Sequence, residues 1–218
     1  MKAKGSTELH ARSSLLSNFI LGSQDGLVNV LGILLGLTAA TSDVRLIFVA
    51  AFAALGAESI SMGAVAYTST LARRKQYLKE VSRETAEMKD VPQKEKKEVR
   101  DIFEQWGYKG DELERLTELI ASRPKAWLEF MMSHELHLEA VDESEPRRSF
   151  FVVLTSTIFG SIIPLIPYFL VGKDVFLGAV GSVVVSGAVL PWVSRLVRGL
   201  RLRVGTLGFP CETTSGSK

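Results

Sequence analysis

The chain has 218 residues, of which 23% are charged, a formal net charge of +2 and a mean hydropathy of +0.18. The net charge argues neither for nor against nucleic acid, and because no nucleic-acid-binding motif occurs we expect no such partner. The single cysteine, Cys211, excludes an intramolecular disulfide.

The charges are unevenly distributed. Four apolar stretches of about 20 residues match the length that a helix needs to cross a bilayer. A core helix of a soluble protein usually shows a polar face at helical spacing, and the third stretch shows none. The composition therefore predicts an all-α integral membrane protein with four transmembrane helices. The stretches are Phe19–Thr38, Leu46–Thr70, Phe150–Val171 and Val175–Ser194.

A polar block separates the two pairs of predicted spans. We expect residues 1–72 to hold a tail and the first two spans, 73–147 a helical insert, 148–200 the last two spans, and 201–218 a polar tail. Lys and Arg flank the spans on the sides of the termini and the insert, and the two short connectors carry one basic residue each. Both termini and the insert are therefore predicted to face the cytosol.

Four helices are predicted in and around the insert. The second span continues through Leu71–Lys89 without a helix breaker, and Asp90-Val91-Pro92 ends it. Helices are then expected at Lys94–Trp106, before Gly107, at Asp111–Ser122 with Asp111 as N-cap, and at Lys125–Val141 with Pro124 in the first turn.

The carboxylates of the insert recur at helical spacing. Glu80, Glu84 and Glu87 share one face, and Glu95 and Glu98 share another. On the last helix Met131 and Met132 precede Glu135. Carboxylates together with thioethers favour first-row transition metals over Mg²⁺ or Ca²⁺. The alternative is a solvated face paired with interleaved Lys and Arg, with the methionines as core filler.

Two acidic residues lie inside the predicted spans. Asp25 occupies the first and Glu58 the second, and neither span contains a Lys or Arg to neutralise them. A charge in the bilayer centre costs at least about 2.5 kcal/mol on insertion scales, so these residues are candidates for function. Met62 lies one helical turn after Glu58, and Asn29 one turn after Asp25. This set suits a partly dehydrated divalent cation and carboxylates that exchange it for protons.

Three segments resemble the vacuolar iron transporter family. They are Asp25-Gly26-Leu27-Val28, Glu58-Ser59-Ile60-Ser61-Met62-Gly63 and Phe130-Met131-Met132-Ser133-His134-Glu135-Leu136. The resemblance implies a homodimer that exchanges protons for Fe²⁺, with Mn²⁺ as a second cargo, out of the cytosol across a plasma or vacuole-type membrane. It implies no enzymatic activity, and we expect no prosthetic group.

The resemblance also implies roles for single residues. Asp25 and Met62 are the expected ion ligands of the translocation path, and Glu58 is a path carboxylate able to carry protons. The residues of the expected cytosolic metal cluster are Glu84, Glu87, Glu95, Glu98, Met131, Met132 and Glu135.

The sequence departs from the family in its number of spans. Family members typically have five, whereas four are predicted here, because the chain after Ser194 is too charged to cross. An alternative is therefore a membrane-anchored iron store or sensor that does not conduct. A di-iron oxidase is less favoured, because it would need Glu-x-x-His pairs on two helices and residues 79–99 contain no His.

Overall fold

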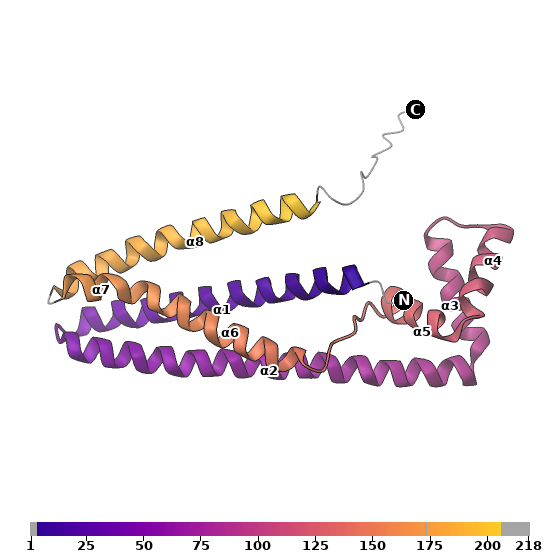
Figure 1. Cartoon of the computed structure of the whole chain (residues 1–218), viewed down its shortest axis with the longest axis horizontal. Helices are drawn as coiled ribbons and strands as arrows, with labels where there is room; N and C mark the ends of the chain where they lie inside the picture. The colour runs from indigo at the N-terminus through magenta and orange to yellow at the C-terminus, as the bar shows by residue number, and fades with distance from the viewer. Residues whose placement is uncertain (1–3, 173, 206–218) are drawn as a thin grey trace, which may run out of the picture. The chain divides into compact units, whose positions relative to one another are not determined.

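The computed structural model describes residues 4–172 and 174–205, and the described chain is helical apart from short connections (Figure 1). The helices are α1 (Lys4–Ala40), α2 (Val44–Asp90), α3 (Pro92–Gln105), α4 (Gly110–Ala121), α5 (Pro124–Phe130), the π-helix η1 (Met131–Glu135), α6 (Glu145–Ile162), the 3₁₀ helix η2 (Ile163–Leu165), α7 (Ile166–Val171) and α8 (Val175–Gly205). This confirms the predicted all-α class.

The chain divides into two compact units. One comprises Met1–Val65 and Ser149–Lys218, and we call it the bundle unit. The other, Ala66–Arg148, we call the insert unit. Helix α2 is continuous through the boundary, as expected from the absence of a breaker between the second predicted span and Lys89.

Three described helices are long and apolar enough to cross a membrane. They are Leu15–Ala40, Val44–Asp90 and Glu145–Val171, and less than half of each apolar window is buried within the protein. Only an apolar environment accommodates so much exposed apolar surface, so this is an integral membrane protein. The fourth predicted span corresponds to a shorter apolar segment in the described part of α8, Val175–Pro191, and the count of four spans stays a prediction.

The third predicted span is not one straight helix. A 3₁₀ turn at Ile163–Leu165 separates α6 from α7. Pro164 and Pro167 cause the break, because proline lacks the backbone N–H that an α-helix needs and its ring crowds the preceding turn. The break places the Tyr168 ring in the bundle core beside Leu34 and Ile47. Its hydroxyl lies 2.5 Å from Thr38 Oγ1.

The insert unit folds around its own apolar core. Val99 and Phe103 of α3 pack with Leu113 of α4, Trp127 of α5 and Met131 of η1. These side chains recur along one side of each short helix, which is the pattern of amphipathic helices closing over a core.

Two details of the insert differ from the sequence predictions. The N-cap of α4 is Lys109, in extended backbone, and Asp111 lies inside the first turn, where its charge favours the helix N-terminus. The last predicted helix, Lys125–Val141, is α-helical only to Phe130. It then widens into the π-helix and ends before His137, whose φ is +53°. Sequence spacing does not distinguish a π-turn from an α-turn.

Candidate metal centre

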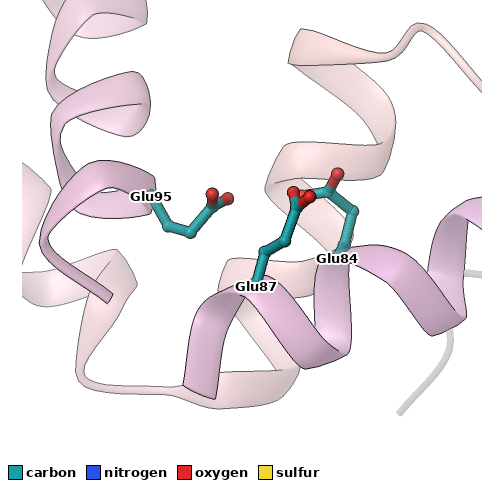
Figure 2. A group of neighbouring side chains, drawn as sticks. All are labelled: Glu84, Glu87 and Glu95. Carbon is teal, nitrogen blue, oxygen red and sulfur yellow. The ribbon is translucent and has the colours of Figure 1, made fainter. Parts of the chain in front are cut away.

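Three predicted ligands come together where α2 meets α3. Glu84 and Glu87 lie on the last turns of α2, and Glu95 lies on the first turn of α3. Each offers a carboxylate oxygen, and these oxygens all lie within 4.8 Å of one another (Figure 2). Val91 and Pro92 make the corner, because Pro92 begins a new helix and cannot continue the old one. The corner turns Glu95 back toward the α2 carboxylates.

The carboxylates of this cluster are buried without enough partners. Glu84 is 1% exposed and Glu95 is 0% exposed. Both oxygens of Glu95 and the Oε2 atoms of Glu84 and Glu135 lack a hydrogen-bond partner. A buried charge without a partner costs several kcal/mol, so such groups normally coordinate a metal or hold a proton. The arrangement is that of a cation site.

Protein cations neutralise only part of this charge. Arg83 contacts Glu80 at 2.9 Å and Glu84 at 3.0 Å, and Lys94 contacts Glu98 at 3.2 Å. The ion pairs considered as an alternative are therefore present, and Lys94 Nζ also lies 3.8 Å from Glu95 Oε1, yet none of these cations donates a hydrogen bond to the oxygens above. Glu80 belongs to the same acidic group, and its buried Oε2 is ion-paired with Arg83 Nη1 at 2.9 Å. Its seven-residue spacing from Glu87 was the signal that it belongs to the same face.

Two carboxyl groups of the cluster have strongly raised pKa values. Burial, together with the negative charges of Glu98 and Glu84, raises the pKa of Glu95 to about 7. Burial likewise raises the pKa of Glu135 to about 7, again helped by Glu98 and Glu84. These influences link Glu135 of η1 to the carboxylates of α2 and α3. Near neutral pH the cluster therefore exchanges protons readily.

The two predicted thioethers are buried in η1. Met131 is 0% exposed and Met132 is 2% exposed. The π-helix is closed by the bond from Leu136 N–H to the Met131 carbonyl, 3.1 Å long. Met131 belongs to the apolar core with Trp127, as the core-filler interpretation expects. Met132 lies outside that group of packed core residues and is the better candidate for a soft ligand.

A second group of predicted residues lies in the bundle unit. The Asp25 side chain of α1 and the Glu58 side chain of α2 are in hydrogen-bonding contact, and Asn29 also contacts the Glu58 carboxyl. Two carboxyl groups in contact share either a proton or a cation. Met62 is half-buried one turn further along α2. This pairing across two helices joins residues that lie 33 positions apart in the chain.

The fold and these sites define an α-helical membrane protein that carries a cluster of acidic residues within Ala66–Arg148. Residues 16–206 match the model of the VIT family, and the chain belongs to that family.

Named relatives agree with this assignment. The chain is 32% identical over 166 residues to "Vacuolar iron transporter 1" of Arabidopsis thaliana, covering 76% of this chain and 66% of the relative. It is 34% identical over 169 residues to "Vacuolar iron transporter 2" of Oryza sativa subsp. japonica, covering 76% and 68%. A "Vacuolar iron transporter" of Plasmodium falciparum is 32% identical over 167 residues, covering 75% and 60%. The chain thus spans about two thirds of the length of these relatives.

Proposed function

We propose that this protein moves Fe²⁺, with Mn²⁺ as a second cargo, out of the cytosol in exchange for protons. The observation that carries the proposal is the set of buried carboxylate oxygens on Glu84, Glu95 and Glu135 that have no hydrogen-bond partner. The names of the relatives support iron as cargo.

The insert unit captures the metal. Glu84, Glu87 and Glu95 supply a first set of oxygen ligands. Glu98 and Glu135 are their electrostatic neighbours, and Met132 adds a thioether. Carboxylate with thioether suits Fe²⁺ and Mn²⁺ better than Mg²⁺ or Ca²⁺. The basic residues that flank the spans favour a cytosolic position for this unit and for both termini.

The bundle unit supplies the translocation path. The paired carboxyl groups of Asp25 and Glu58 hold either protons or a divalent cation, since two adjacent negative charges need one or the other. Release of the metal from this pair is accompanied by uptake of protons, which makes the exchange electrically compensated. Met62 contributes a thioether to the same stretch of α2.

The chain acts as a homodimer with four spans in each protomer. The exposed apolar surface of the bundle supports both lipid and protomer contacts. The apolar segment Val175–Pro191 of α8 supplies most of the fourth span. The membrane is a plasma or vacuole-type membrane.

The proposal is tested with purified protein in proteoliposomes whose interior is acidic and carries a pH-sensitive dye. Fe²⁺ added outside under anaerobic conditions enters only if protons leave. We expect metal-dependent alkalinisation of the interior with the unmodified chain and none with Asp25→Ala. Gly32→Ala, at a glycine of the same helix with no neighbouring atom within 4 Å, is the matched control.

Equal flux through Asp25→Ala would refute the assigned path. Iron entry without any pH change would refute the exchange with protons.

A second candidate function is a membrane-anchored iron store or sensor. It is favoured by one observation: the acidic cluster is built within Ala66–Arg148, without residues of the bundle unit. The same proteoliposomes separate the two functions, because a store binds Fe²⁺ stoichiometrically and produces no flux.

A further inference from the structure

Helix α1 meets α6 through three glycines beside Asp25. A Cβ added at Gly160 of α6 would lie 1.9 Å from the carbonyl oxygen of Ser23. One added at Gly26 would lie 2.4 Å from the carbonyl oxygen of Thr157, and one at Gly22 would lie 2.3 Å from Ser156 Oγ. The two backbones are therefore in direct contact at this level, which only glycine allows.

The contact between α1 and α6 leaves one buried polar group without a hydrogen-bond partner. Ser161 is 0% exposed and its Oγ has no hydrogen-bond partner. That oxygen would lie 2.6 Å from a Cβ at Gly26, so it is aimed at the bare face of this glycine. Gly32 and Gly36, further along α1, have no neighbouring atom within 4 Å. Among these four glycines of α1, close approach is confined to Gly22 and Gly26, on the turns that carry Asp25.

These turns are held from two sides. Gly22 and Gly26 are four residues apart and share the face of α1 that contacts α6. Asp25, between them in sequence, contacts Glu58 of α2. A shift of α1 away from α6 therefore changes the separation of the two carboxyl groups.

We propose that Gly22, Gly26 and Gly160 are positioning residues that set the distance between Asp25 and Glu58, and thereby the choice of divalent metal. The proposal rests on the function proposed above. A methyl group at position 160 requires a displacement of about 1 Å to relieve its contact with Ser23. Metal coordination tolerates changes of only about 0.2 Å in ligand distance. The displacement therefore exceeds what the carboxyl pair can absorb.

The first experiment measures Fe²⁺ and Mn²⁺ uptake into proteoliposomes for Gly160→Ala, with Gly32→Ala and Gly36→Ala as controls. We expect Gly160→Ala to raise the half-saturating Fe²⁺ concentration several-fold and to change the ratio of Fe²⁺ to Mn²⁺ uptake. Both controls are expected to keep the original values. An unchanged ratio in a folded Gly160→Ala protein would overturn the proposal, as would an equal change in the controls.

A second-site rescue tests the same contact from the other helix. The nearest obstacle to a methyl group at position 22 is the Ser156 hydroxyl, so Ser156→Ala removes it. We expect Gly22→Ala to alter the metal ratio and Gly22→Ala/Ser156→Ala to restore most of it. The comparison of these two variants still tests the proposal if Gly160→Ala does not fold. A folded double variant that keeps the altered ratio would count against the proposal.

Equilibrium binding separates this inference from transport. Mn²⁺ binding is measured by electron paramagnetic resonance on the full chain with Glu95→Gln and Glu135→Gln in the insert unit, with and without Gly160→Ala. Bound Mn²⁺ that weakens on adding Gly160→Ala supports positioning even if no flux occurs, in which case only the transport function fails. Binding that is unaffected by Gly160→Ala refutes positioning whatever the flux.

Discussion

Replacing Glu95 by glutamine should stabilise the metal-free insert while weakening its metal site. The pKa of this fully buried carboxyl is raised from 4.5 to about 7. The folded state therefore binds the proton more tightly than the unfolded state. Binding of this proton stabilises the folded state fully below about pH 4.5, and this stabilisation is lost as the pH rises through about 7. At about 1.4 kcal/mol per pKa unit, the ionised carboxylate costs about 3 kcal/mol above pH 8.

Glutamine has the same shape and no charge, so Glu95→Gln removes this cost. Hydrogen exchange of the amides of α3 in the full chain measures it at pH 8 with a chelator present. We expect slower exchange in the variant than in the original chain, and the difference should vanish near pH 5. With Fe²⁺ added, the order should reverse, because the original chain binds the metal more tightly. A variant that exchanges faster than the original chain at pH 8 without metal would refute the account of a buried charge that lacks hydrogen bonds.

Three further predictions concern other groups. Metal affinity of the insert should rise between pH 6 and pH 8, because protons compete with the metal at Glu95 and Glu135, whose pKa values are about 7. Calorimetry in buffers of different ionisation enthalpy should detect the released protons. A metal affinity that does not change with pH would contradict this prediction. Met132→Leu should lower Fe²⁺ affinity more than Mn²⁺ affinity in competition titrations with little loss of stability, because the volume is conserved and only the thioether is removed. Tyr168→Phe should lower the free energy of unfolding of the bundle by about 1 kcal/mol, because the substitution removes the hydroxyl that is hydrogen-bonded to Thr38. An unchanged melting temperature would mean that this bond makes no net contribution.

Much of the fold follows from the sequence, because it depends on local properties of the chain. Apolar length predicts which helices cross a bilayer, and the absence of a breaker predicts that α2 continues to Asp90. Pro92 and Gly107 mark helix boundaries that the structure also has, because backbone constraints at these residues act locally. Intramembrane acidic residues stand out from their surroundings without any knowledge of packing.

The grouping of the site residues depends on tertiary structure. Spacing places Glu84 and Glu87 on one face of α2. It does not reveal that the corner at Val91 brings a carboxylate oxygen of Glu95 to within 4.8 Å of carboxylate oxygens of these two residues. Burial decides which of these carboxylates lack partners, and burial depends on helices that are distant in the sequence. For the same reason the raised pKa of Glu135 could not be read from its neighbours in the chain.

The sequence by itself determined the helical class, the membrane location and the residue types able to bind a metal, because these follow from composition and from spacing along single helices. Only the tertiary structure decided that Glu84 and Glu95 are buried without enough partners, that η1 is a π-helix, and that α1 touches α6 at Gly160. The physical reason is that burial, unsatisfied charge and backbone contact are properties of pairs of elements. They exist only once the helices have packed.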